Sequence, residues 1–149
     1  MMHLECEWRS RGFAGPPNWL RSGENGLILH RCWGFRTRDV GSSEWGRDDR
    51  EVYFSLEKAT SVLDAEMRFN IVVWGNGVNF VSTFRLKPGF HYWCGKVAHS
   101  PLDDALPATQ VVIDQPVRIK LELHRSKEVL RHDVFVGPKD GASGRLAND

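Results

Sequence analysis

The sequence has no long apolar run and no export signal, and each absence removes a class of protein. No apolar stretch approaches the roughly 20 residues that a membrane-spanning helix needs, which predicts a soluble protein with no membrane partner. Residues 1–14 lack the continuous apolar centre of a secretory signal. We therefore expect a cytoplasmic protein, with export only through a specialised secretion route.

Cysteine is scarce, and no spacing typical of metal ligands is present. The three cysteines, Cys6, Cys32 and Cys94, are odd in number and form no C-x-x-C pair, which argues against a disulfide framework and against a zinc knuckle. The histidines show neither H-x-x-x-H nor H-E-x-x-H spacing on a predicted helix. The sequence therefore predicts a reducing compartment and no bound metal.

An excess of charge of one sign is also lacking, because 20 basic residues stand against 19 acidic ones and the net charge is +1. No overall field attracts the chain to nucleic acid, so nucleic acid is not favoured as a partner and a local site must select the ligand. The G-x-S-x-G turn of serine hydrolases is absent. Gly75 and Gly77 follow a predicted helix, which is typical of a turn and not of a phosphate loop.

What the sequence does contain is enough apolar material for one domain. The 149 residues are 41% hydrophobic, a length and composition ordinary for a single compact core. Proline and glycine are dense in residues 1–25, which predicts an irregular lead-in. We expect one domain over residues 1–149, with a core at 26–137 and a flexible polar tail at 138–149.

Hydrophobic periodicity predicts an α+β domain. Period-two or short apolar patterns indicate strands over Leu27–Phe35 and over residues 51–56, 78–86, 90–99, 110–113, 117–124 and 129–137. The capping box from Ser61 to Asp64 predicts one main helix, inserted after the second strand and running to about Trp74. About six or seven strands should form mixed or antiparallel sheets, two of them packed on each other.

The most distinctive stretch places an arginine and a serine on either side of a charged loop. Arg31 lies in the first predicted strand, and its guanidinium is costly to bury unless it meets an anion or a carboxylate such as Glu51 or Asp39. Residues 36–50 form a loop whose length is typical of a functional or a disordered segment, and Trp45 favours function. The pattern indicates a ligand site that this loop closes.

The order of these features, with Arg31 on one strand, Tyr53 and Ser55 on the next, then a helix and further strands, resembles the mono-ADP-ribosyltransferase fold of the arginine-serine-glutamate class, found in bacterial toxins and effectors. In that family an Arg on the first core strand grips NAD. A Ser after an aromatic residue holds the cleft together and faces the nicotinamide ribose, and a Glu on a later strand completes the site. The resemblance covers residues 26–113.

The resemblance implies NAD as substrate and a catalytic set of Arg31, Ser55 and Gln110. Gln110 occupies either the glutamate position or the first position of a Q-x-E motif, since the segment there reads Ala108-Thr109-Gln110. The residues that it implies in contact with NAD are His30, Arg31, Trp33, Tyr53 and Ser55.

Such a site would expel nicotinamide through an oxocarbenium-like ribose, as in glycoside cleavage. The Arg31 fork would bind the pyrophosphate, and nicotinamide would stack on Tyr53 or Trp33. Gln110 can bond the ribose 2′-OH but cannot act as a base. Unless a carboxylate comes from elsewhere, NAD hydrolysis, transfer to a strong nucleophile or simple nucleotide binding is favoured. The available candidates are Glu66, Asp103 and Asp104. The acceptor is an unknown macromolecule, and an immunity or chaperone protein is a candidate partner.

Two other functions are compatible with the sequence. A metal-independent ribonuclease needs histidines and a cation at a phosphate pocket, and His91 or His99 beside Arg31 would supply them. A non-catalytic binding module would use the six tryptophans to contact a partner or a sugar. For each of the residues singled out above, an ordinary structural role, at a strand end, in an ion pair or in core packing, is the alternative to a functional one.

Overall fold

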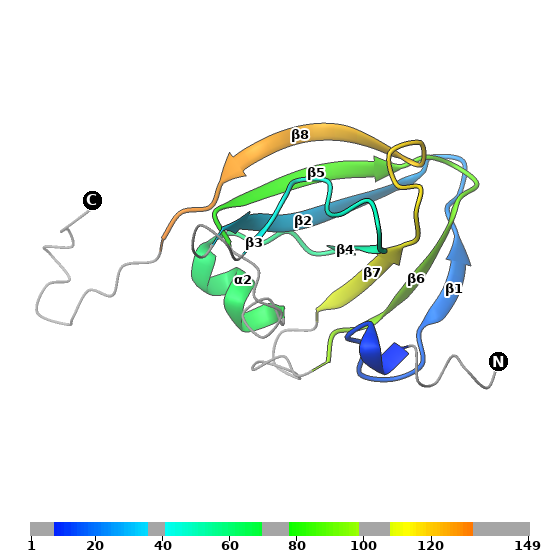
Figure 1. Cartoon of the computed structure of the whole chain (residues 1–149), viewed down its shortest axis with the longest axis horizontal. Helices are drawn as coiled ribbons and strands as arrows, with labels where there is room; N and C mark the ends of the chain where they lie inside the picture. Colours follow the sequence, from blue (N-terminus) through cyan, green and yellow to red (C-terminus); the bar gives the residue numbers. More distant parts are fainter. Residues whose placement is uncertain (1–7, 36–40, 70–77, 99–107, 133–149) are drawn as a thin grey trace, which may run out of the picture.

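The computed structural model describes residues 8–35, 41–69, 78–98 and 108–132, and within them it shows one antiparallel sheet of eight strands (Figure 1). The strand order is β1-β6-β7-β4-β2-β5-β8, and the short β3 pairs with β2. The elements are β1 (Asn18–Arg21), β2 (Leu27–Phe35), β3 (Gly41–Ser42), β4 (Val52–Ser55), α2 (Val62–Arg68), β5 (Phe80–Leu86), β6 (His91–Lys96), β7 (Thr109–Ile113) and β8 (Leu121–Val129).

The α+β class is confirmed, but the prediction of two packed sheets is wrong. The single sheet curls (Figure 1), so that strands far apart in the strand order share one core. Leu86 of β5 and Tyr92 of β6 belong to the same buried cluster, although β2, β4 and β7 lie between their strands. The curled sheet therefore buries one face against itself, and a second sheet is not needed to cover it.

The two faces of the sheet pack against different groups of buried residues. Leu29, Phe54 and Phe84 lie on the self-buried face, which we call the core face. On the other face, Val81 packs in a cluster with Ala65 and Phe69 at helix α2, and we call this the helix face. Successive side chains of a strand alternate between faces, so each strand presents one set of residues to each side.

Helix α2 begins where the capping box predicts and ends earlier than expected. The Ser61 hydroxyl accepts a hydrogen bond from the Asp64 backbone N–H at 3.1 Å. The helix stops at Arg68, because Phe69 takes an extended conformation with φ −115° and ψ 154° and is buried in the cluster on the helix face. The predicted end at Trp74 and the Gly75–Gly77 stop signal lie outside the described residues.

Two further predictions need correction. The lead-in, predicted to be irregular, contains β1, which pairs with β6 directly after Pro16-Pro17 as an edge strand, where proline is tolerated. The strand predicted at 117–124 begins later and runs further, as β8, across the charged residues up to Val129; the strand predicted at 129–137 overlaps it only there, and its residues 133–137 lie outside the described part. Its pairing with β5 shifts register at two points, and Lys127 has a positive φ of 54°. Residues 133–149, including the predicted tail, are outside the described part.

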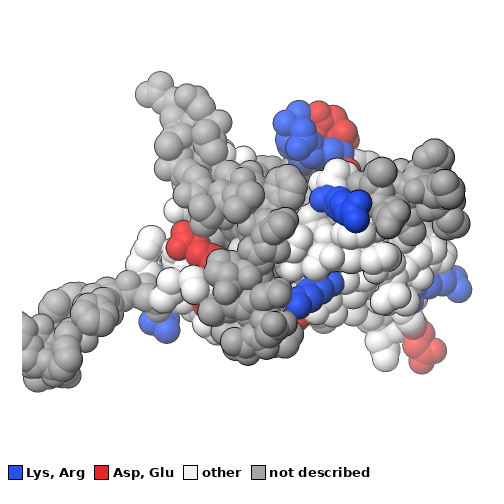
Figure 2. Space-filling model, turned by 90° about the horizontal axis from the view of Figure 1, so that it is seen from below, with Lys and Arg blue, Asp and Glu red and all other residues white. Residues whose placement is uncertain are grey.

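Among the residues that the structure describes, no helix is both long and apolar enough to cross a membrane. On the part of the surface that Figure 2 shows and describes, Lys and Arg are scattered among other residues and form no continuous patch.

Candidate functional site

A cavity of about 600 Å³ opens where β2 and β4 separate. Five of the six predicted site residues line it, and these come from β2, β4 and β7. The residues lining it are Ser10, His30, Arg31, Cys32, Gly41, Ser42, Ser43, Gly46, Arg47, Arg50, Glu51, Val52, Tyr53, Phe54, Ser55, Phe69, Val97 and Gln110. The predicted set is thus largely brought together.

The strand register explains why these residues meet. β2 and β4 pair only at His30 and Ser55, and Ser55 is in turn the partner of Gln110 on β7. Directly opposed residues of neighbouring strands point to the same side. His30, Ser55 and Gln110 therefore form a row across three strands on the helix face, while the alternate residue Arg31 starts from the core face.

The Arg31 side chain fills the gap between the separated strands. Its guanidinium donates to three backbone carbonyls: Nη1 to Tyr53 at 3.1 Å, Nη2 to Ser43 at 3.1 Å, and Nε to Glu44 at 3.1 Å and to Ser43 at 3.3 Å. Through these bonds Arg31 joins β2 to the β3–β4 loop and to Tyr53 of β4, where the two strands are no longer paired with each other. Arg31 thus holds the β3–β4 loop onto the sheet.

Arg31 binds these carbonyls in place of the carboxylate partner that the sequence suggested. Only 7% of the residue is exposed, and burial lowers its pKa to about 10, so it stays charged at neutral pH. Within the described residues, the carboxylate of Glu51 is contacted by Arg11 and Tyr53 instead. The other suggested partner, Asp39, lies outside the described part.

Ser55 and Gln110 are both buried, and both side chains donate hydrogen bonds to backbone carbonyls. The Ser55 hydroxyl donates to the Glu57 carbonyl at 2.7 Å. The Gln110 amide donates to the Arg11 carbonyl at 2.6 Å, which ties the lead-in to the start of β7. The side-chain carbonyl of Gln110 remains as an acceptor, and an amide cannot take up a proton at ordinary pH.

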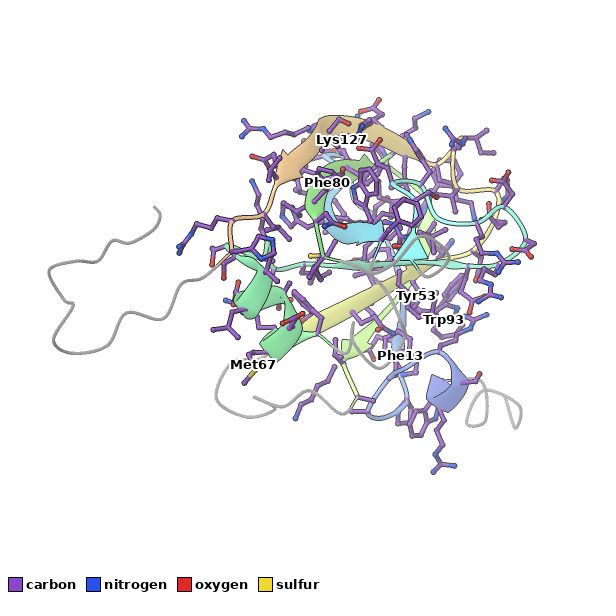
Figure 3. All side chains as sticks on the ribbon, turned by 60° about the vertical axis from the view of Figure 1, so that its left-hand side comes forward. Phe13, Tyr53, Met67, Phe80, Trp93 and Lys127 are labelled. Carbon is purple, nitrogen blue, oxygen red and sulfur yellow. The ribbon has the colours of Figure 1, made fainter. Side chains whose placement is uncertain are left out.

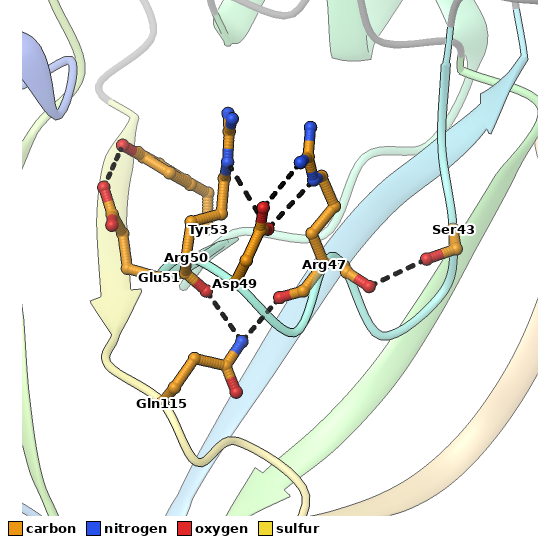
Figure 4. A network of polar contacts seen from close by, with 8 residues as sticks. Ser43, Arg47, Asp49, Arg50, Glu51, Tyr53 and Gln115 are labelled. Atoms are coloured by element: carbon orange, nitrogen blue, oxygen red, sulfur yellow. Dashed lines mark hydrogen bonds and ion pairs between the residues drawn. The ribbon is translucent and has the colours of Figure 1, made fainter.

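At the other end of β4 the cavity is charged. Tyr53 donates its phenol hydrogen to Glu51 Oε2 at 3.0 Å, and Arg47 forms a two-bond pair with Asp49 at 3.0 and 2.6 Å (Figure 4). Gln115 bridges the carbonyls of Arg47 and Arg50, each at 2.6 Å. Burial, with the Glu51 charge next in importance, raises the pKa of Tyr53, so the phenol remains a donor.

The cavity therefore extends along β4 from an apolar end to a charged end. Glu51 and Ser55 are four residues apart on extended chain, a separation of about 13 Å. Cys32, Phe69 and Val97 line the cavity and belong to the apolar cluster on the helix face. One end is therefore apolar and the other carries Arg47, Arg50 and Glu51.

His30 and Trp33 have other neighbours than the resemblance implies. His30 Nδ1 lies 3.0 Å from the Thr83 hydroxyl on β5, and burial, followed by the charge of Lys58, lowers the pKa of His30. Trp33 donates its indole hydrogen to the Ser82 hydroxyl at 2.9 Å and packs on Phe80. Trp33 is therefore not a wall of the cavity.

The two rival functions find less support in the arrangement. His91 lies on β6, with β7 and β4 between it and β2; it stacks on Trp19 and does not line the cavity that contains Arg31, as a ribonuclease would require. His99 lies outside the described residues. Trp8 and Trp33 are buried and Trp45 packs on Phe84, which leaves fewer tryptophans to contact a partner.

Comparisons with protein-family models, with curated proteins and with solved structures found no match. Within the described part of the chain, no group of three or more His, Cys, Asp or Glu side chains is arranged to hold a metal ion. The residues themselves must therefore carry the functional argument.

Sequence reasoning considered Glu51 only as an ion-pair partner of Arg31 and did not consider Ser10, although both line the cavity. Glu51 precedes Tyr53 and Ser55 with period two, so alternation alone places all three on one face, and this signal was available. Ser10 lines the cavity, and its neighbour Arg11 contacts Glu51 and Asp114 at 4.0 and 3.5 Å. Nothing in the composition of the lead-in indicates that it returns to the sheet at this point.

Proposed function

We propose that this cavity binds NAD and that the protein is an ADP-ribosyltransferase-like toxin or effector domain. It would cleave the bond between nicotinamide and ribose and pass ADP-ribose to an acceptor macromolecule or to water. The observation that carries the proposal is the convergence of His30, Tyr53, Ser55 and Gln110, from three strands, on one cavity.

The shape and polarity of the cavity support a dinucleotide. Its volume of about 600 Å³ lies within the range of about 300–1,000 Å³ usual for ligand pockets. A dinucleotide has flat aromatic rings joined by a charged diphosphate, and the cavity likewise joins an apolar end to one with two arginines. Tyr53, at its wall, offers an aromatic ring on which nicotinamide can stack.

The roles of the arginines follow from their contacts. The Arg31 guanidinium is already bonded to the carbonyls of Ser43, Glu44 and Tyr53, so we assign it to holding the loop that shapes the cavity. Arg47 and Arg50 line the cavity, and among the described residues the carboxylate that both side chains contact is the exposed one of Asp49. A diphosphate would displace Asp49 from these two guanidinium groups and bind them in its place.

The test is calorimetric titration of the protein with NAD. We expect saturable binding, and we expect the double variant R47A/R50A to bind at least about tenfold more weakly, since each charged hydrogen bond is worth about 1.5–3 kcal/mol. Arg125→Ala is the matched control, because that arginine lies on β8 and does not line the cavity. Absence of binding at millimolar NAD, or equal weakening by the control, would contradict the proposal.

A further inference from the structure

Glu51 is the single acidic side chain among the described residues that line the cavity. We propose that Glu51 supplies the carboxylate of this site and that the nicotinamide ribose lies at this charged end of the cavity, about 13 Å along β4 from Ser55 and its partner Gln110, and not beside these two residues as the resemblance implies. The inference rests on the proposed NAD function and deepens it, since it names the reacting group and the orientation of the dinucleotide.

The surroundings of Glu51 fix its carboxylate in place. Its Oε2 accepts the Tyr53 phenol hydrogen at 3.0 Å and lies 4.0 Å from the Arg11 Nε. The side chains of Glu51 and Arg11 are 26% and 21% exposed, so the group is partly screened from water but open to a ligand. Both contacts involve Oε2, and Oε1 has no hydrogen bond or ion pair to another described residue, so it is the oxygen available to a substrate.

The chemistry requires a carboxylate that Gln110 cannot provide. When the C1′–N bond breaks, its electron pair leaves with the nicotinamide nitrogen and C1′ becomes an oxocarbenium-like cation, which a nearby carboxylate stabilises. A water oxygen then attacks C1′, and the water proton passes to Glu51 and from there to solvent. The products are nicotinamide, ADP-ribose and one proton.

The other carboxylates near the site are less well placed. Glu57 follows β4, and its Oε1 accepts the Thr109 backbone hydrogen at 2.8 Å, so it caps the start of β7 and does not line the cavity. Asp49 is held by Arg47 at the exposed rim. Tyr53, by contrast, donates its phenol hydrogen to Glu51 and lines the same cavity, so a nicotinamide stacked on its ring would lie beside the Glu51 carboxylate.

The experiment compares Glu51→Gln with Glu57→Gln in the full chain. For each protein, NAD affinity is measured by calorimetry and nicotinamide release by chromatography. We expect Glu51→Gln to bind NAD within about threefold of the parent and to lose at least about 100-fold in kcat, within the range for a positioned acid-base group. Glu57→Gln should keep the parent kcat. Tyr53→Phe, which removes only the hydroxyl, should lower kcat with little change in affinity.

The outcomes separate the inference from the function on which it depends. If Glu51→Gln releases nicotinamide as fast as the parent, the role of Glu51 is overturned, and NAD cleavage remains as the function of the protein. If the parent binds NAD but releases no nicotinamide, the catalytic role of Glu51 is overturned as well, because no cleavage takes place for a carboxylate to assist. No NAD binding by the parent overturns the proposed function itself. If Glu51→Gln fails to fold, Glu51→Asp replaces it: the shorter carboxylate should retain the fold and release nicotinamide more slowly.

Discussion

The guanidinium of Arg31 is bound by neutral backbone carbonyls, which is an uncommon way to bury a cation. Carbonyl oxygens carry partial negative charge, and the four contacts with Ser43, Glu44 and Tyr53 together replace the water that the cation has lost. The Ser43 carbonyl also accepts the Gly46 backbone hydrogen at 3.1 Å, whereas the Glu44 carbonyl has no other backbone donor among the described residues. The cation and the carbonyls therefore depend on each other.

At the scale of this residue, Arg31→Met should lower the free energy of unfolding by about 2–4 kcal/mol. Methionine has a similar length but removes the Arg31 donors from all three carbonyls, of which Ser43 alone keeps the Gly46 backbone hydrogen as a donor outside the strands. Urea denaturation measures the loss, and Arg125→Met, at an exposed position on β8, should change stability by less than about 0.5 kcal/mol. A stable Arg31→Met variant that no longer binds NAD would instead show that the guanidinium serves the ligand directly.

Residue patterns predicted which positions gather at the site but not how their side chains are used. Alternation along β2 and β4 predicted that Arg31 starts from a buried strand and that Ser55 lies near a strand end. The partner of Arg31 could not be found in this way, because backbone carbonyls belong to every residue and leave no trace in the sequence. For the same reason the bond from Gln110 to the Arg11 carbonyl was not foreseen.

At the scale of elements, helix α2 shows how a short segment depends on its cap. Its seven residues are too few for a stable isolated helix, so the cap and the burial of Ala65 maintain it. Asp64 adds to the cap by accepting the Thr60 backbone hydrogen at 2.9 Å and by pairing with Arg68 at 3.1 Å. The helix in turn positions Phe69 at the apolar end of the cavity.

Ser61→Ala should therefore lower the free energy of unfolding by about 1 kcal/mol, because the Asp64 N–H loses its acceptor. Thermal unfolding followed by circular dichroism would show a lower midpoint than in the parent. Ser61→Thr keeps the hydroxyl and should remain closer to the parent. Equal losses in both variants would mean that packing at this buried position, rather than the cap, is responsible.

Elements with a strong local signal were predicted well, and those set by distant pairing were not. β2 has the predicted bounds, and α2 begins at the predicted cap. The strand predicted to end at His124 continues in the structure to Val129, because its charged centre stays paired with β5 through shifts in register. The single sheet was missed for a related reason, since alternation shows that a strand has a buried face but not what buries it.

At the scale of the whole molecule, the lead-in closes the helix face of the sheet over β6, β7 and β4. Phe13 packs with Trp8 and Val112, and Tyr53 and Trp93 pack against the same cluster (Figure 3). The backbone N–H of Ala14 donates a hydrogen bond to the Lys96 carbonyl, and that of Ala98 donates one to the Gly12 carbonyl, each at 2.9 Å. The lead-in is thus part of the folded domain and forms one side of the cavity through Ser10.

Phe13→Ala should lower the free energy of unfolding by about 3–5 kcal/mol, because the residue is 2% exposed and the vacated volume cannot be filled by its neighbours. Phe35→Ala is the matched control: that ring is 57% exposed, and its loss should cost less than about 1 kcal/mol. Chemical denaturation of both variants gives the comparison. If the lead-in were a detachable strap and not part of the core, Phe13→Ala would leave the main unfolding transition unchanged, and only proteolysis of residues 8–14 would accelerate.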